Sequence, residues 1–441
     1  MRILMVSDHA DPLAKIGSKE SGGQNIYVMN IAKLLAKHGH QVDVYTRWDQ
    51  PSKQEVVQVS AGFRVIRVKA GPKGYMPRDD FLKIIPEFIA RVKERIELEA
   101  ISYDVVFSNY WFSGVIGLEL AKQYDLPQTH VYHSIGQIRY ETLKDVQPQS
   151  VDNNLFRIRN MWEKRIAQAC ANVLTTSPVE RADIQRLFGI DEQKITCIPI
   201  GVDLKLFRPR SMATLRQKLK LPQDRPVVLF VGRLELRKGI GTLIKSLADI
   251  PKAELYIVGG GAGKAAQQLD TIEKTRLQKI AEDMHVTNRV HFLGAKQQAQ
   301  VALYYAAADV CVVPSYYEPF GIVPIEAMAT GTPVVASRTG GMRFTVVEDE
   351  TGHLAKPKDH KDLASKINLV LERGKEAYTK AARRYVQQYF SWPKIAKDTS
   401  DFLQSLITPR QSSFELDTAT NAEVSATESR GDKTTGSLFS I

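Results

Sequence analysis

The segment SYYEPFGIVPIEA, residues 315–327, holds two glutamates, Glu318 and Glu326, separated by seven residues. Glu318 lies in a loop after a predicted strand, and Glu326 lies on the helix that follows this loop. The N-terminus of that helix, near Gly321–Val323, offers free backbone N–H groups to a phosphate. We therefore expect Glu318 to face the hydroxyls of a sugar and Glu326 to accept hydrogen bonds from both hydroxyls of a ribose. Two surface glutamates placed by chance would explain this arrangement poorly.

A second candidate site follows the predicted strand Val227–Gly232, in the run GRLELRKG that begins at Gly232. Arg233 and Lys238 stand five residues apart and would place two cations at the carboxyl edge of a sheet. Ligands of doubly wound folds bind at that edge, and two cations there suit a diphosphate. A solvated loop is the alternative interpretation, and it would account for most isolated pairs of this kind.

Paired glycines, Gly22 and Gly23, precede a predicted amphipathic helix at Ile26–His38. Because glycine has no Cβ, the backbone here can approach a diphosphate closely with its N–H groups directed at the phosphates. Most glycine pairs are simply turns, so this pair alone is weak evidence for a binding site. The other candidate sites strengthen the interpretation. It would supply the N-terminal wall of a cleft, in which Gln24 can hydrogen-bond a second substrate.

The glycine-rich run Gly259–Lys264 fits neither of the nucleotide-binding patterns that it suggests. A P-loop requires glycine at the position of Val258 and a hydroxyl residue at that of Ala265. A dinucleotide fingerprint requires a third glycine where Lys264 stands. We therefore interpret the run as a strand-end loop beside the nucleotide pocket.

These candidate residues need a scaffold that brings several strand ends together, and the chain contains two series of strands that alternate with helices. Each strand is short, rich in β-branched residues and bounded by Gly, Pro or polar residues, which is typical of a parallel sheet covered on both faces. The first series is Arg2–Ser7, Gln41–Thr46, Arg64–Lys69, Asp104–Ser108, His130–His133, Val173–Thr176 and Ile195–Ile200. The second series is Val227–Gly232, Glu254–Val258, Val290–Leu293, Val310–Pro314 and Pro333–Ala336. The pattern predicts an α/β fold of two tandem Rossmann-like domains.

The chain of 441 residues is too long for one ordinary core. We assign residues 1–201 to the N-terminal domain and residues 202–390 to the C-terminal domain, with a linker in the turn-rich run GVDLKLFRPRS. Helical periodicity is interrupted near Pro393, so a helix at about 391–408 is expected to cross back onto the first domain. Residues 409–441 are polar, with few large apolar side chains, and are predicted to be disordered.

Composition limits the class of partner. The net charge of +11 suits a phosphorylated small molecule, whereas the absence of a basic block with interleaved aromatic residues argues against nucleic acid. The N-terminus does not resemble a signal peptide, and no window approaches 18 apolar residues, so we expect a cytoplasmic protein without membrane association. The basic amphipathic segment 88–100 is explained more simply by a helix that covers the sheet. Three widely separated cysteines have no metal-ligand spacing and are expected to be free thiols.

With these motifs the chain resembles the retaining glycosyltransferases of family four, which have the GT-B fold, over residues 1–408. The resemblance implies a C-terminal domain that binds a nucleotide sugar, an N-terminal domain that binds the acceptor, and an active site in the cleft between them. Arg233 and Lys238 would contact the diphosphate, Glu318 the donor sugar and Glu326 the ribose. Backbone groups of four further residues would hold the phosphates and the sugar: Phe320, Gly321, Ile322 and Val323.

His133 ends a predicted strand and matches the active-site histidine of this family. A lone histidine is more often structural, but this placement predicts that it contacts the transferred sugar rather than acting as a strong base. In retaining members the acceptor hydroxyl is thought to attack from the face that the diphosphate leaves, and the donor phosphate takes its proton. The protein then contributes positioning and charge stabilisation, for which the candidate catalytic residues are His133, Glu318, Arg233 and Lys238. A double displacement would need a carboxylate on the opposite face, for which no candidate is evident.

No Asp-any-Asp triplet occurs in the chain. Metal-dependent sugar transferases of the other main fold use such a pair to hold a divalent ion on the diphosphate. We therefore predict no metal and no cofactor, with Arg233, Lys238 and helix N-termini neutralising the leaving group. UDP-glucose is the expected co-substrate.

The acceptor is predicted from a narrower resemblance. The stretches SDHADPLAKIGSKESGGQNIYV and HSIGQIRYE are similar to the sucrose-phosphate synthase and sucrose synthase branch. In that branch a basic residue after His-Ser-x-Gly and arginines on a later helix hold the phosphate of fructose 6-phosphate. The matching acceptor-binding residues would be Gln24, Ser134, Arg139, Arg157 and Arg159, with the choice between the last two left open.

Other functions remain open at this stage. The stretches NIYV and NYWFSG also resemble inositol-phosphate N-acetylglucosaminyltransferases, which take a phosphorylated acceptor too, and a lipid or polysaccharide acceptor comes third. A non-catalytic sugar-nucleotide sensor is the alternative from another class, but it would not need the full set of candidate catalytic residues. If sucrose 6-phosphate is the product, a separate phosphatase must follow in the pathway.

Deleting the residues after Thr408 is predicted to cost little stability, because a polar tail of this composition cannot bury enough apolar surface to offset its ordering entropy. Thermal unfolding of the full-length and shortened proteins measures the effect. A large fall in melting temperature on deletion would mean that the tail packs against the rest of the chain.

Overall fold

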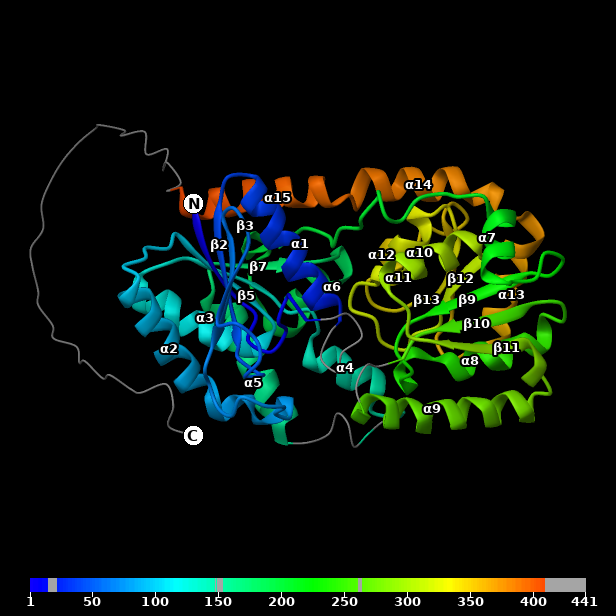
Figure 1. Cartoon of the computed structure of the whole chain (residues 1–441), viewed down its shortest axis with the longest axis horizontal. Coiled ribbons are helices and arrows are strands. Elements are labelled where there is room, and N and C mark those ends of the chain that lie inside the picture. Colours follow the sequence, from blue (N-terminus) through cyan, green and yellow to red (C-terminus); the bar gives the residue numbers. More distant parts are fainter. Residues whose placement is uncertain (15–21, 147, 149–153, 261–263, 409–441) are drawn as a thin grey trace, which may run out of the picture. The chain divides into compact units, whose positions relative to one another are not determined.

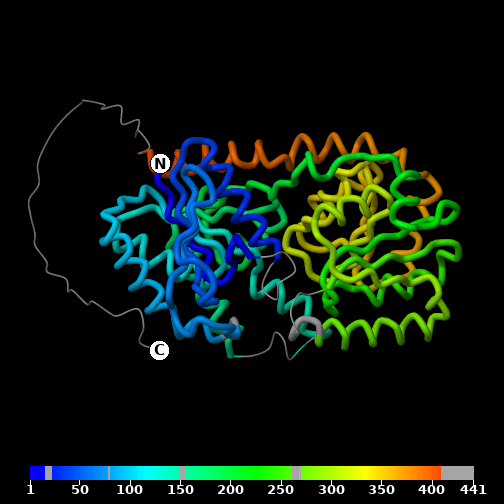
Figure 2. The backbone as a smooth tube through the Cα atoms, in the orientation of Figure 1, coloured from blue at the N-terminus to red at the C-terminus, as the bar shows by residue number. Residues whose placement is uncertain are grey.

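Short apolar runs form the strands of two separate sheets in a computed structural model that describes residues 1–14, 22–146, 148, 154–260 and 264–408. The predicted tail, 409–441, and the centre of the glycine-rich run, 261–263, lie outside these ranges. Residues 1–407 form one compact unit. Figure 1 shows the two sheets with their helices, and Figure 2 traces the chain from the first sheet into the second and back.

The N-terminal sheet has eight strands within the described residues, in the order β3-β4-β2-β1-β5-β6-β7-β8. All neighbours are parallel except β3 and β4, which pair antiparallel. The strands are β1 (Arg2–Val6), β2 (Gln41–Arg47), β3 (Val56–Ser60), β4 (Phe63–Val68), β5 (Val105–Asn109), β6 (Gln128–Val131), β7 (Asn172–Thr175) and β8 (Ile195–Cys197). Because β6 ends at Val131, His133 lies in the loop beyond the strand rather than at its last position.

The C-terminal sheet has six parallel strands within the described residues, in the order β11-β10-β9-β12-β13-β14. They are β9 (Val227–Val231), β10 (Glu254–Val258), β11 (Val290–Gly294), β12 (Val310–Val313), β13 (Val334–Ser337) and β14 (Gly352–Ala355). In both sheets the strand order reverses beside the first strand, between β1 and β5 and between β9 and β12. Such switch points open a crevice at the carboxyl edge of a doubly wound sheet. The predicted fold class of two Rossmann-like domains is confirmed.

The helices connect these strands and flank the sheets (Figure 1). Those of the N-terminal part are α1 (Gly23–Lys37), α2 (Ile85–Leu98), α3 (Trp111–Tyr124), α4 (Gly136–Leu143), α5 (Asn154–Ala169) and α6 (Pro178–Phe188). Those of the C-terminal part are α7 (Met212–Leu219), α8 (Ile240–Ser246), α9 (Lys264–Asp283), α10 (Gln298–Ala307), α11 (Ile322–Ala329), α12 (Met342–Thr345), α13 (His360–Arg373) and α14 (Glu376–Tyr389). Among the described residues, no helix is long and apolar enough to cross a membrane.

The last helix, α15 (Trp392–Ile407), begins after a break at Phe390–Ser391, as Pro393 predicts. It packs on α1, whereas α14 packs on α11. The chain therefore crosses between the two sheets twice, at Gly201–Val202 and at Phe390–Trp392. The two crossings are joined to each other, because the Val202 N–H donates to the carbonyl of Phe390 at 2.7 Å.

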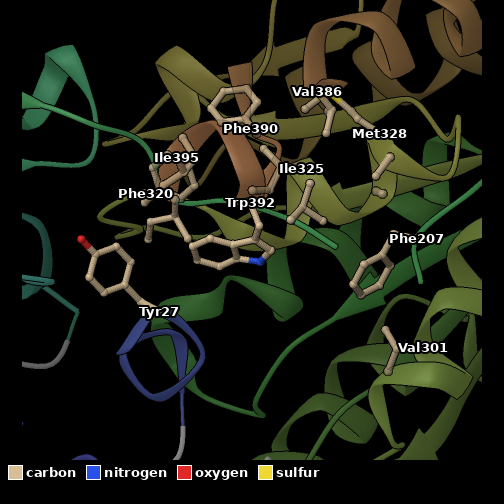
Figure 3. Packing of buried hydrophobic residues seen from close by; sticks show 14 of the residues in the cluster. Tyr27, Phe207, Val301, Phe320, Ile325, Met328, Val386, Phe390, Trp392 and Ile395 are labelled. Carbon is tan, nitrogen blue, oxygen red and sulfur yellow. The ribbon is translucent and has the colours of Figure 1, made fainter. Parts of the chain in front are cut away.

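Trp392 anchors this crossing. Figure 3 shows its indole among Phe320, Ile325 and Ile395, in a core that reaches Tyr27 on one side and Phe207 on the other. The indole also lies against Gly201, where an added Cβ would come within 2.4 Å of Trp392 Cδ2. Glycine is needed at position 201 because the indole occupies the space of a side chain.

Replacing Gly201 by alanine is predicted to destabilise the protein by about 1–3 kcal/mol, because the new methyl group overpacks the contact with Trp392. The free energy of unfolding from chemical denaturation measures the change. Gly74→Ala is the matched control, since a Cβ at Gly74 meets nothing within 4 Å. Equal stabilities of the two variants would contradict this account of the crossing.

Candidate active site

One cleft of about 930 Å³ lies at the carboxyl edges of both sheets and is lined by residues from both halves of the unit. Fourteen of the sequence-predicted site residues line it, and the other two, Arg157 and Arg159, do not. The lining residues are Gly22, Gly23, Gln24, His133, Ser134, Arg139, Arg233, Lys238, Glu318, Phe320, Gly321, Ile322, Val323 and Glu326. Residues distant in the sequence thus share one cleft, although their contacts with substrates remain predictions.

The loops after β9 and β12 are joined by an ion pair. Lys238 Nζ lies 2.5 Å from Glu318 Oε2, and Ser315 Oγ donates to the same carboxylate at 3.4 Å. Burial alone would raise the pKa of Glu318, but the charges of Lys238 and Arg237 hold it below its usual value. Burial lowers the pKa of Lys238, opposed by Glu318. The carboxyl of Glu318 is therefore ionised near neutral pH.

A third cation, Arg237, lies in the same loop and was not singled out from the sequence. Its Nε is 2.6 Å from Glu235 Oε2, and Arg233 Nη1 is 2.9 Å from Glu235 Oε1. Glu235 thus separates two guanidinium groups that would otherwise repel each other. With Lys238 and Glu318, the group has three cations and two carboxylates, and its net positive charge suits a diphosphate.

Glycines after β13 fix the position of Glu318. Gly340 has φ +48°, and a Cβ there would lie 2.1 Å from the carbonyl oxygen of Glu318. The N–H of Gly341 donates to the carbonyls of Glu318 and Pro319, at 3.2 and 3.1 Å. The loop that precedes α11 is therefore packed directly on this glycine pair. Gly321, with φ +96°, then turns the chain into α11, whose first residues, Ile322 and Val323, line the cleft.

Glu326 lies on α11 and is buried. It accepts hydrogen bonds from Gln298 Nε2 at 3.3 Å and from the Tyr305 hydroxyl at 3.1 Å, one on each carboxylate oxygen. Burial raises its pKa to about 7, against the effect of these two hydrogen bonds. Each oxygen retains lone-pair capacity for one more donor, as a pair of ribose hydroxyls would require.

His133 is held in the left-handed backbone region, with φ +56°. This conformation is uncommon for a residue with a side chain and often marks a functional position. Its Nε2 lies 3.0 Å from Asn109 Oδ1, and its ring meets the edge of Tyr27 at 5.1 Å between centroids. Burial and the nearby His9 lower the pKa of His133 to about 3. The imidazole is therefore neutral, with Nε2–H donating to Asn109 and Nδ1 left as an acceptor.

The N-terminal wall is built by the start of α1. The Gly22 N–H donates to Asn25 Oδ1 at 2.9 Å, and a Cβ on Gly23 would lie 3.2 Å from Ile322 Cδ1. Gln24 is held by bonds from its Nε2 to Ser7 Oγ and to the Asn109 carbonyl, both at 3.2 Å. The N-termini of α1 and α11 thus both open on the cleft, as an anionic ligand between them would need.

The structure separates the three arginines expected to bind acceptor phosphate. Arg139, on α4, lines the cleft, whereas Arg157 is exposed on α5 away from it. Arg159 is buried behind the cleft, with its Nε 2.6 Å from Glu163 Oε1 and Nη2 2.5 Å from the Ser134 carbonyl. Glu163 in turn accepts from the Gly136 N–H at 2.9 Å. In this conformation Arg159 braces the Ser134–Gly136 loop rather than lining the cleft.

Sequence reasoning missed several residues that line the cleft, notably His9, Tyr110 and Tyr317. Tyr110 follows β5 with φ +76° and ψ 156°, a region that side chains rarely occupy, and its ring lies 4.7 Å from that of His9. His9 and Tyr110 both follow a strand closely in the sequence, as His133 does. This placement could have marked them as candidate cleft residues. Arg276 on α9 also lines the cleft, but nothing in the sequence distinguished it from other helix-surface cations. Among the described residues, no cluster of metal-ligating side chains was found.

Comparisons with known proteins agree with this geometry. Residues 211–388 match the family "Glycosyl transferases group 1", and residues 21–206 match "Glycosyltransferase Family 4". The D-inositol 3-phosphate glycosyltransferase of Xylanimonas cellulosilytica is 33% identical over 405 residues, covering 90% of this chain and 94% of the relative. The chain belongs to glycosyltransferase family four. Another relative in this family, the D-inositol 3-phosphate glycosyltransferase of Mycolicibacterium smegmatis, is 33% identical over 89% of this chain and 88% of its own length.

Solved structures resemble the chain as well. A sucrose-phosphate synthase from Thermosynechococcus elongatus has a TM-score of 0.83 and 39% sequence identity, covering 92% of this chain and 98% of that one. The HepE protein of Anabaena, solved in complex with UDP-glucose, has a TM-score of 0.69 at 23% identity, covering 92% of this chain and all of that one. At that lower identity the likeness shows only the fold.

Donor affinity is predicted to rise as the pH increases through about 7, the pKa of Glu326 in the empty site. Below that value the carboxyl is protonated and accepts ribose hydroxyls weakly, whereas above it the carboxylate accepts them strongly. Calorimetric titration with UDP-glucose between pH 6 and 8 measures the effect, since the diphosphate of this ligand does not titrate there. Glu326→Gln is expected to bind more weakly with a flat pH profile, and a similar pH slope in that variant would assign the titration to another group.

Proposed function

We propose that the chain transfers a glucosyl group from UDP-glucose to fructose 6-phosphate with retention of configuration, giving sucrose 6-phosphate. The observation that supports this function best is the presence of two separate cationic regions in one cleft. Arg233, Arg237 and Lys238 form one region at the C-terminal sheet, and Arg139 stands at the N-terminal wall. A nucleotide diphosphate and a phosphorylated acceptor would use one region each.

The choice of acceptor is supported by sequence similarity. The sucrose-phosphate synthase of Thermosynechococcus elongatus is 39% identical, against 33% for the inositol-phosphate transferases described above. Both activities use a phosphorylated acceptor, so the position of Arg139 suits either. We therefore retain N-acetylglucosaminyl transfer to an inositol phosphate as the second candidate, supported by the names of these relatives.

In the proposed reaction the acceptor hydroxyl forms a bond to the anomeric carbon on the face from which the diphosphate departs. The leaving UDP takes up the hydroxyl proton, so no protein base is required. Lys238, Arg237, Arg233 and the N-terminus of α11 stabilise the charge that develops on the diphosphate. Glu318 and the neutral His133 hold the hydroxyls of the transferred sugar, His133 as an acceptor through Nδ1. We propose that this cationic group replaces a metal ion.

The product of this reaction is a sugar phosphate, and a separate phosphatase acting on a phosphate monoester must then release the free disaccharide. Inorganic phosphate would be the other product of that step. The proposed transfer is therefore followed by a hydrolytic reaction, which makes the two reactions together irreversible.

A matrix of sugar nucleotides against phosphorylated acceptors, assayed in excess EDTA, tests the proposal. Turnover is expected to be highest with UDP-glucose and fructose 6-phosphate, measured as UDP release with mass detection of the disaccharide phosphate. Turnover only with an inositol phosphate would move the chain to the second candidate. Donor binding without turnover on any acceptor would favour a sensor, and activity that needs added magnesium would refute the metal-free mechanism.

A further inference from the structure

Tyr317 belongs to the loop of the C-terminal sheet that bears Glu318, yet its side chain is buried against the N-terminal half. Only 6% of the residue is exposed, and its ring packs with Leu143 of α4 and with Ile138 and Tyr140 around it. Its hydroxyl lies 2.8 Å from Ser134 Oγ. The two hydroxyls meet in the cleft that both residues line.

The surroundings of this hydroxyl are cationic. Burial raises the pKa of Tyr317 to about 12, but the hydrogen bond with Ser134 and the positive charges of Arg159 and Arg139 act against this rise. Glu163, which acts to raise this pKa, is paired with Arg159. The phenol thus stays protonated near neutral pH, and two arginines lie close enough to act on it.

The two hydroxyls together retain a donor for a ligand. Each of them has one proton, and their mutual hydrogen bond uses one of the two. The remaining proton is available to an anion in the cleft, next to the guanidinium of Arg139. A phosphate monoester has acceptor oxygens to match a hydroxyl and a guanidinium at the same time.

The backbone of Tyr317 is fixed to the loop expected to bind the donor diphosphate. Arg237 Nη1 donates to the Tyr317 carbonyl at 3.3 Å, and the Tyr316 N–H donates to the Arg237 carbonyl at 2.8 Å. The next residue, Glu318, is paired with Lys238. The backbone of Tyr317 therefore belongs to the loop expected to bind the donor, whereas its hydroxyl lies in the part of the cleft expected to bind the acceptor.

We propose that Tyr317 is a binding residue for the anionic group of the acceptor, supplied by the donor-binding half and completing a subsite with Ser134 and Arg139. The inference rests on the phosphorylated acceptor of the proposed function. It adds a residue from the opposite half, so that the acceptor phosphate is fully bound only when the loop of Glu318 is in place. Donor and acceptor then strengthen each other's binding, and this coupling is reciprocal.

Tyr317→Phe tests the inference, because it keeps the ring against Leu143 and removes only the hydroxyl. The KM for fructose 6-phosphate is expected to rise about tenfold, as for loss of a hydrogen bond to a charged group, while the KM for UDP-glucose, extrapolated to low acceptor concentration, changes little. Tyr316→Phe is the matched control. It removes a hydroxyl that bonds Thr242 at 2.8 Å outside the cleft, so both KM values should stay near those of the unmodified protein. KM values do not depend on the fraction of active enzyme, so a modest loss of folded protein leaves the comparison valid.

Calorimetry gives a readout that a purely structural role would not change. Fructose 6-phosphate is expected to bind the unmodified protein more tightly when UDP is present, and Tyr317→Phe should abolish this gain. An unchanged acceptor KM, or an unchanged gain with UDP, would overturn the inference while leaving the proposed function intact. If only inositol 3-phosphate is turned over, the proposed acceptor is wrong, and the same measurements with that compound decide the role of Tyr317. Absence of turnover and binding with both phosphorylated compounds would refute the proposed function and the inference together.

Discussion

The partly buried ion pair between Lys238 and Glu318 is the constraint on which the cleft depends. It joins the loops after β9 and β12, the two strands that flank the switch point of the C-terminal sheet. Removing one partner leaves the other charge uncompensated in a partly desolvated site, which is destabilising. The two loops are therefore held to each other, and Arg237, Tyr317 and the start of α11 take their positions from them.

The N-terminal half combines the buried pair of Arg159 and Glu163 with two residues in strained backbone conformations. Tyr110 and His133 follow the neighbouring strands β5 and β6, and both have positive φ values. Each such residue costs on the order of 1–3 kcal/mol and persists only where its surroundings determine it. Three contacts hold these two residues in place. Asn109 hydrogen-bonds His133, whereas Arg159 and His9 both pack against the ring of Tyr110. Rigid side chains thus face the rigid loops of the other half.

The fold and much of the candidate site could be predicted from the sequence because the signals were local. Strand runs, the turn before α11 and the cations after β9 are each contained in one short segment. The edge strand β3 was missed because it is half-exposed and pairs antiparallel with β4, so it lacks the apolar run of a buried parallel strand. Arg159 was one of two alternatives for a phosphate contact, and its buried pairing with Glu163 could not be foreseen, because an Arg and a Glu one helical turn apart look in the sequence like any surface pair. Tyr317 was overlooked since its contacts come from the other half of the chain.

The packing of α15 on α1 has a consequence for how the protein is made. More than three hundred residues separate α1 from α15, so the part of α1 that α15 covers stays exposed while these residues are being added. Domains generally fold as units during synthesis, N-terminal first. In this chain the N-terminal sheet cannot reach its final packing in that order, and the C-terminal half must fold beside an incomplete neighbour. Protection of α1 from premature association is thus a requirement of the nascent chain rather than of the finished enzyme.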